Sequence, residues 1–233
     1  MILMETQLPR TRPRFAVIAL LASLAGCAMS PPKAPPVRAQ LAVEAAPAET
    51  ADWRSMVTEP DARRLDGIEQ AWADGLASVR GAGLLRRVKA EGALLDPAAT
   101  LPRAALPPGS YRCRILRLGG SGRKRGFIVF PSFFCHVAHE GELLSLTKQT
   151  GSERPGGYLW EDGRDRMIFL GSVALGDETT PPAYGKDPAR DMAGVVERVA
   201  PFQYRLVMPS PRAAAKLDIL ELVPALPPEL QRP

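Results

Sequence analysis

Histidine is scarce in this 233-residue chain, which has only two, and no apolar run approaches the ~20 residues that a membrane-spanning helix needs. With so little histidine, catalysis that uses a histidine base has little material, and no Gly-x-Ser-x-Gly sequence marks a nucleophilic serine. The glycine-rich stretch at residues 119–126 lacks the Gly-Lys-Ser/Thr ending of a phosphate-binding P-loop. The sequence therefore gives no support for a histidine-dependent hydrolase, an α/β-hydrolase or a P-loop nucleotide-binding enzyme.

The composition is otherwise that of a soluble protein with one domain of ordinary size. Hydrophobic residues make up 45% and charged residues 24%, which excludes a wholly disordered chain, a coiled coil and a multi-span membrane protein. The 24 prolines argue against a helical bundle, because each proline removes a backbone donor and fixes φ. Short elements and many loops are therefore expected.

The N-terminus has the features of a bacterial lipoprotein signal. Three arginines precede an apolar stretch at residues 15–26, which ends in Leu-Ala-Gly followed by Cys27. Leu-Ala-Gly-Cys resembles a lipobox, and the resemblance implies that residues 1–26 are removed and that Cys27 receives a diacylglycerol and a further acyl chain. Several acyl chains anchor a protein stably in a membrane. The alternative is an ordinary signal peptide cut after Ala28.

The residues after the signal predict a spacer and a location. Residues 27–51 are rich in proline and alanine, a composition that cannot bury a core and favours an extended tether. Ala28 replaces the aspartate that favours inner-membrane retention, so we expect an outer-membrane lipoprotein facing the periplasm. Inner-membrane anchoring and secretion remain as alternatives.

The folded domain is expected to span residues 52–224, with a tail at 225–233. Thr58 and Pro60 suit a helix start, and apolar residues then recur every three or four positions, so residues 58–92 are predicted to be helical. This apolar stripe consists of Leu65, Ile68, Trp72, Leu76 and Val79. The prolines at 97–108 exclude regular structure there.

From residue 109 the pattern changes to short apolar runs separated by glycine, proline or Asp-Gly about every ten residues. We predict strands at residues 111–118, 126–130, 133–137, 143–148, 157–160, 166–174, 194–199, 203–208 and 217–223. The fold class is therefore α+β, with N-terminal helices followed by an antiparallel β-barrel-like or sandwich domain of about eight strands.

Cys113 and Cys135 are predicted to form a disulfide, since two remaining cysteines pair by default in an oxidising compartment. The midpoint between them falls in the glycine-rich loop at residues 119–126, so a hairpin folded about that loop brings the two cysteines together. Pro131 then has to lie at a bulge or corner.

His136 and His139 are the only candidates for a metal site, beside Cys135 and Glu140. Their order is His-x-x-His-Glu, whereas the helical zinc-protease motif is His-Glu-x-x-His, and the segment looks like a strand end and a turn. We therefore favour a solvated loop over a metal site, and expect no catalytic residues and no cofactor. Serine–lysine or paired-carboxylate catalysis is left open, although no motif marks it.

One stretch of the chain, residues 101–130, carries seven basic residues and no acidic one, although the whole chain has a net charge of only +5. The candidate anion-binding residues are Arg112, Arg114, Arg117, Arg123, Lys124 and Arg125. Nucleic acid is not expected as a partner of a secreted lipoprotein. Anionic lipid, lipopolysaccharide or an acidic protein surface fits better, and a merely solvated hairpin face is the alternative.

The C-terminal runs at residues 194–209 and 217–224, with residues 58–65 and the Tyr-Arg-Cys-Arg of 111–114, resemble an uncharacterised family of proteobacterial envelope proteins, a domain of unknown function. The resemblance covers residues 51–224 and implies a secreted or lipid-anchored protein, with no catalytic residues. This chain has Ala-Ala-Ala-Lys before the final strand where the family has Glu-Ser.

A second likeness is to bacterial periplasmic metalloprotease inhibitors, small disulfide-bearing barrels whose N-terminal arm blocks a protease cleft. Its basis is Trp160 before a Gly-Arg-Asp turn and the strand 167–172, which runs into glycine. We expect a non-enzymatic, lipid-anchored envelope protein that binds a protein partner or an anionic envelope component. The alternatives are an inhibitor-like or small-ligand-binding barrel and, less favoured, an unrecognised hydrolase.

Overall fold

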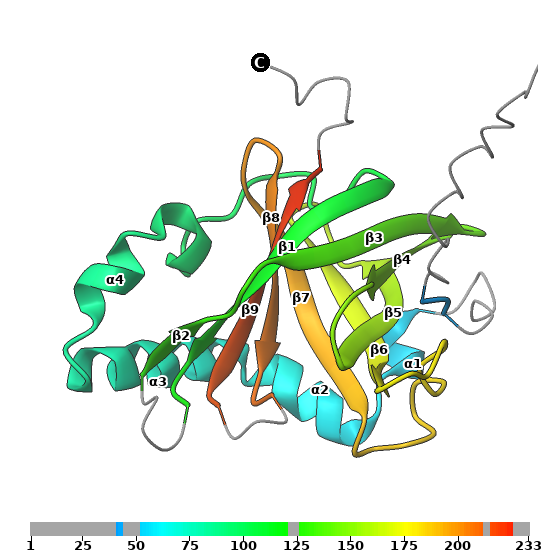
Figure 1. Cartoon of the computed structure of the whole chain (residues 1–233), viewed down its shortest axis with the longest axis horizontal. Helices are drawn as coiled ribbons and strands as arrows, with labels where there is room; N and C mark the ends of the chain where they lie inside the picture. The colour runs from blue at the N-terminus through cyan, green and yellow to red at the C-terminus, as the bar shows by residue number, and fades with distance from the viewer. Residues whose placement is uncertain (1–40, 44–51, 121–125, 212–214, 226–233) are drawn as a thin grey trace, which may run out of the picture. The chain divides into compact units, whose positions relative to one another are not determined.

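The computed structural model describes residues 41–43, 52–120, 126–211 and 215–225. Within them, helices precede a sheet of nine strands (Figure 1). The helices are α1 (Trp53–Met56), α2 (Glu59–Asp66), α3 (Ile68–Gly81), α4 (Leu85–Lys89) and the 3-10 helix η1 (Gly92–Leu95). The strands are β1 (Gly109–Leu118), β2 (Phe127–Val129), β3 (Phe133–Glu140), β4 (Leu143–Lys148), β5 (Glu153–Glu161), β6 (Arg166–Leu175), β7 (Asp191–Ala200), β8 (Gln203–Pro209) and β9 (Leu217–Pro224). All nine predicted strands are present, and the α+β class is confirmed.

The sheet closes into a barrel, because its first long strand pairs with its last. Each strand from β3 to β9 is antiparallel to the next, and β1 pairs with both β3 and β9. The β1–β9 ladder runs from Tyr111 opposite Pro224 to Leu118 opposite Leu217. Eight strands thus form the closed barrel, and β2 is an extra strand on the C-terminal half of β1. Of the two predicted architectures, the barrel is correct and the sandwich is not.

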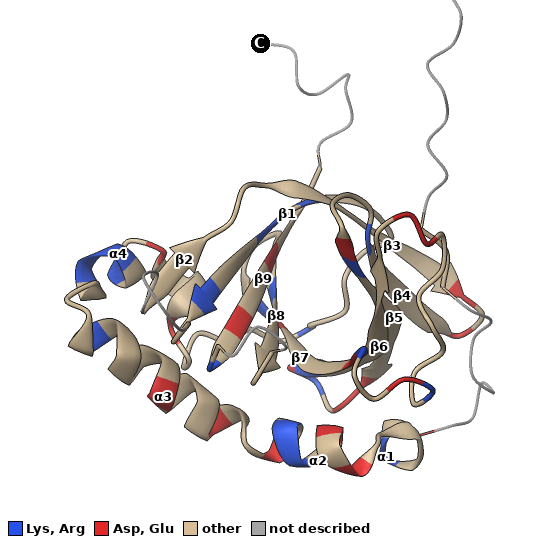
Figure 2. Ribbon diagram, turned by 60° about the horizontal axis from the view of Figure 1, so that its bottom comes forward, with Lys and Arg blue, Asp and Glu red and all other residues tan. Residues whose placement is uncertain are grey.

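The helices cover one side of the barrel wall, as Figure 2 shows. Thr58 is the N-cap residue of α2 and Pro60 lies in its first turn, as predicted. The apolar stripe, however, is divided by Gly67 between two helices rather than borne by one. Leu65 on α2 packs against β5, β6 and β7, whereas Trp72 on α3 packs against β1, β8 and β9. The break at Gly67 lets the apolar stripe of α2 and α3 follow the curved wall of the barrel. None of the helices in the described ranges is long and apolar enough to cross a membrane.

One end of the barrel is closed by the irregular segment at residues 97–108. The backbone N–H groups of Leu101 and Arg103 donate to carbonyls at the end of β7 and in the β5–β6 turn, with N···O distances of 2.8 and 2.9 Å. Ala104 and Leu106, which are 3% and 1% exposed, belong to the apolar cluster inside the barrel. The segment therefore acts as a plug, and we call it the plug below.

The disulfide between Cys113 and Cys135 is confirmed, and strand register explains it. Tyr111 lies opposite Cys135 and Cys113 lies opposite Phe133, so the two cysteines are diagonal neighbours on adjacent strands. Alternate strand residues face the same side of a sheet, and both cysteines face the barrel interior with Cα atoms 6.1 Å apart. Pro131 lies at the corner between β2 and β3, as expected.

Cys113→Ser is expected to lower the free energy of unfolding by about 3 kcal/mol, because the disulfide restricts the unfolded chain over a separation of 22 residues. Urea unfolding under non-reducing conditions measures the loss. Cys113→Ser/Cys135→Ser should lose a similar amount, and dithiothreitol should destabilise the wild type while leaving the double variant unchanged. Equal stability of wild type and variants without reductant would contradict a stabilising disulfide.

Candidate ligand-binding site at the open end of the barrel

The barrel end opposite the plug is hollow. Alternation along β1 turns Ile115 and Arg117 toward the interior, two and four residues after the buried Cys113. They meet residues from the ends of six other strands around a cavity of about 210 Å³. We call this cavity the mouth; its lining residues are Ile115, Arg117, Lys148, Glu153, Pro155, Val173, Met192, Met208, Pro211 and Asp218.

A second hollow of about 520 Å³ continues the mouth outward. It shares Ile115, Arg117, Lys148 and Glu153 with the mouth and adds the β2–β3 corner and the β4–β5 turn. The added residues are Phe130, Pro131, Ser132, Phe133, Thr150, Gly151 and Ser152. A barrel of eight strands has room either to be filled by side chains or to hold one small ligand. Here the plug end is filled and the other end is open.

Arg117 on β1 and Asp218 directly opposite it on the adjacent β9 form a fixed ion pair on one side of the mouth. Arg117 Nε and Nη2 donate to Asp218 Oδ1 and Oδ2 at 2.7 and 2.6 Å, and the side chains are 19% and 6% exposed. The bonded carboxylate raises the pKa of Arg117. Burial raises the pKa of Asp218, and Arg117 opposes that rise. Both charges are satisfied within the pair, whose guanidinium also lies 5.2 Å from the centre of the Phe130 ring.

Lys148 is the other cation of the mouth. Its Nζ donates to the backbone carbonyl of Glu153 at 2.7 Å and lies 4.4 Å from the centre of the Phe133 ring. Burial lowers the pKa of Lys148, and the charge of Glu153 opposes this. No carboxylate in the described residues lies within 4 Å of this ammonium group. Lys148 is therefore partly stripped of water and makes no salt bridge among the described residues, although the charge of Glu153 acts on it.

The three predicted anion-binding residues that the structure describes, Arg112, Arg114 and Arg117, do not share one face. Arg114 lies on the outer wall, where it pairs with Glu221 and, at 2.6 Å, with Glu91, whereas Arg117 faces the interior. Arg112 is exposed. Figure 2 shows charges of both signs spread over strands and helices. Arg123, Lys124 and Arg125 lie outside the described residues.

The two histidines do not converge. His136 lies in β3, within the predicted strand 133–137, and His139 also lies in β3, where a turn or loop was expected. Because they are three residues apart on one strand, they point to opposite faces. In the part of the chain that the structure describes, no group of three or more histidine, cysteine or acidic side chains could hold a metal ion.

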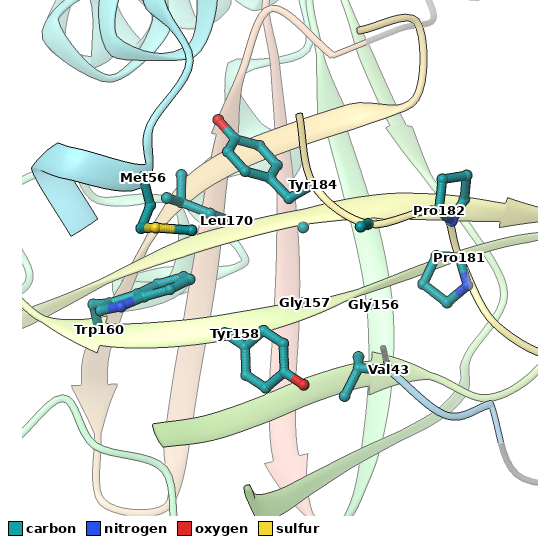
Figure 3. A pocket seen from close by; sticks show the side chains of 12 residues that line it. Val43, Met56, Gly156, Gly157, Tyr158, Trp160, Leu170, Pro181, Pro182 and Tyr184 are labelled. Atoms are coloured by element: carbon teal, nitrogen blue, oxygen red, sulfur yellow. The ribbon is translucent and has the colours of Figure 1, made fainter. Parts of the chain in front are cut away.

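A third hollow, of about 260 Å³, lies on the outer wall over β5 and β6 (Figure 3). Its sides are aromatic or apolar, with Tyr158 and Trp160 on β5 and Met56 on α1. Tyr184 also lines it, but its hydroxyl donates to the buried Asp61 carboxylate at 2.7 Å and points away from the hollow in Figure 3. This outer cleft has apolar walls and suits an apolar group.

Residues 41–43, which belong to the expected spacer, lie against the barrel beside this cleft. Leu41 is 6% exposed, and its backbone N–H donates to Gln149 Oε1 at 2.8 Å. The backbone N–H of Ala42 donates to the Thr179 carbonyl at 3.1 Å, and Val43 lines the outer cleft. The chain thus reaches the folded domain next to the last residue of β4, which is Lys148.

Sequence reasoning singled out Arg117 but not Lys148 or Asp218. Both could have been found from the alternation of inward- and outward-facing residues along their strands. In β4 the inward residues are Leu144, Leu146 and then Lys148, and in β9 they are Asp218, followed by two inward leucines. A charged residue at the end of a strand whose other inward-facing residues are apolar indicates the rim of the barrel interior.

The comparisons with known proteins identify a domain but no activity. The sequence model of one family, described as a domain of unknown function (DUF4893), matches residues 53–222, from α1 through nearly all of β9. No curated protein and no solved structure matches the chain.

Proposed function

Because the chain belongs to the DUF4893 family, whose domain has no known function, we propose a role from its geometry alone: it is a non-enzymatic protein that binds one small amphipathic molecule in the mouth. The observation that carries this proposal is a barrel plugged at one end and hollow at the other. Small-molecule sites combine apolar walls with a few placed polar groups. The mouth has such walls in Ile115, Val173 and Met192, and its charges lie at the rim.

The polar groups of the mouth favour binding over catalysis. Ser132 and Ser152 line the adjoining hollow together with Lys148, but Lys148 Nζ donates to a backbone carbonyl and, within the described residues, to no serine hydroxyl. Both carboxylate oxygens of Asp218 accept from Arg117, so this acid is held in a salt bridge. Neither arrangement provides a free general base.

We place this binding protein in the cell envelope. The lipobox-like sequence supports a lipid anchor at Cys27 and an outer-membrane, periplasm-facing location. An inhibitor-like role is less favoured, since residues 53–95, which precede the barrel, are mostly helices packed on its wall rather than a free arm.

Met192→Trp is expected to block the mouth and to weaken binding of 1-anilinonaphthalene-8-sulfonate, an amphipathic fluorescent probe, by at least about tenfold, because the larger ring fills the cavity. Met56→Trp makes the same change at a half-buried methionine of the outer cleft and should leave binding unchanged. Fluorescence titration gives both affinities, and circular dichroism verifies folding.

Two outcomes would overturn the proposal. One is a wild-type protein that does not bind the probe saturably. The other is loss of binding in Met56→Trp with retention in Met192→Trp, which would move the site to the outer cleft.

A further inference from the structure

We propose that the mouth selects single-chain molecules that end in a carboxylate, with the carboxylate bound by Lys148 and the chain lying along the apolar wall; this rests on the proposed function. Four charged side chains line the mouth, and three of them are accounted for. Arg117 and Asp218 neutralise each other, and the carboxylate of Glu153 is on an exposed residue that water can solvate. Lys148 is the remaining charge.

Lys148 has the capacity to bind an anion. An ammonium group has three donors, and one of them is used on the Glu153 carbonyl at 2.7 Å. The others have no carboxylate to meet among the described residues, and partial burial has removed part of their water. A ligand carboxylate would gain charge-assisted hydrogen bonds there, which are stronger than those of a neutral group.

The shape of the barrel fixes the orientation of such a ligand. Because the plug fills the far end, the mouth is the one entrance to the barrel interior that the described residues form, and the apolar end of a ligand has to go in first. Met192 and Met208 lie on the path; methionine is flexible and adapts to a linear chain. The head group then stays at the rim, which is where Lys148 lies.

Other head groups fit less well. An amine would meet Lys148 as a like charge. Of the two carboxylates that line the mouth, Asp218 already accepts two hydrogen bonds from Arg117, and Glu153 is exposed to water. An alcohol could accept a hydrogen bond but would leave the ammonium charge without a counterion. The expected order of affinity is therefore carboxylate, then alcohol, then amine.

The test uses decanoate, decanol and decylamine, which share a chain length and differ in head group. Isothermal titration of the folded, lipid-free domain should give a decanoate affinity about tenfold above that of decanol. Lys148→Met should remove that difference by weakening decanoate far more than decanol, and Lys148→Arg should retain it. Lys186→Met removes an exposed lysine of the β6–β7 loop and should change nothing.

The outcomes separate this inference from the proposed function. If all three molecules bind equally, if decylamine binds most tightly, or if Lys148→Met keeps the preference for decanoate, carboxylate selection is wrong while ligand binding in the mouth stands. If none of the three binds and the fluorescent probe does not bind either, the proposed function itself fails. Thermal unfolding of each variant shows that any lost affinity is not lost folding.

Discussion

Arg205→Met is expected to lower the free energy of unfolding by about 3–5 kcal/mol, the cost of leaving the partners of a buried charge unpaired. The side chain of Arg205, on β8, is 0% exposed. Its Nη1 donates to the Asp96 carbonyl at 2.7 Å and to those of Ala93 and Leu94 at 3.2 Å. Its Nε donates to Glu197 Oε2 at 2.7 Å. One guanidinium thus joins the end of η1 to the barrel wall.

Methionine has a similar length to arginine but no donors, so the Leu94 carbonyl and Glu197 Oε2 would each lose the guanidinium donor while partly buried. The Ala93 and Asp96 carbonyls would keep only a backbone N–H donor each. It would also lose the contact between the guanidinium and the Trp72 ring, whose centre is 5.1 Å away. Urea unfolding measures the change. Arg205→Lys should recover only part of the loss, since lysine cannot reproduce the planar fork.

The control is Arg86→Met, which removes an exposed arginine from α4 and should change stability by less than about 0.5 kcal/mol. If Arg205→Met were as stable as Arg86→Met, the helical layer would not depend on this guanidinium.

Gly171→Ala is expected to cost about 3 kcal/mol or more, because the added methyl group would overlap the backbone of a neighbouring strand. A Cβ on Gly171 would lie 2.4 Å from the Gly156 carbonyl oxygen and 2.8 Å from the Cα of Gly157. Gly157 and Gly171 face each other in the β5–β6 ladder. Backbone atoms cannot rotate away as a side chain can, so the two strands would have to separate.

Gly81→Ala provides the matched control. Gly81 ends α3, and a Cβ there would meet no atom within 4 Å apart from its chain neighbours and the backbone of its own helix. Alanine favours helices over glycine, so this variant should be as stable as the wild type or slightly more stable. Thermal unfolding of both variants tests the comparison. Equal melting temperatures of Gly171→Ala and Gly81→Ala would mean that β5 and β6 can move apart to accommodate the methyl group at little cost, which would contradict the prediction.

The strands could be predicted from the sequence, but the closure of the barrel could not. Glycine, proline and Asp-Gly mark where each strand ends, since they act on the local backbone. The β1–β9 pairing joins residues about 100 positions apart, for example Leu116 and Ile219, and alternation tells which face a residue occupies but not which strand lies beside it. Barrel and sandwich were therefore equally compatible with the pattern.

The candidate site was predicted only in part for the same reason. Arg117 looked like one of six cations on a hairpin, because its partner Asp218 is distant in sequence. Its neighbour Arg114, three residues away, faces the opposite side of β1 and pairs with Glu91 and Glu221. A count of basic residues cannot show that Arg114 and Arg117 face opposite sides of the sheet. That depends on the alternation along β1, and their pairing depends on carboxylates from other elements.

The attachment of residues 41–43 beside Gln149 has a consequence for ligand supply. A lipid anchor at Cys27 would lie 14 positions before Leu41, so the intervening chain could span at most about 50 Å. The folded domain would then stay near the bilayer rather than sample the whole compartment. Confinement of this kind raises the effective concentration of any amphiphile that leaves the membrane, so even a modest intrinsic affinity would suffice for occupancy.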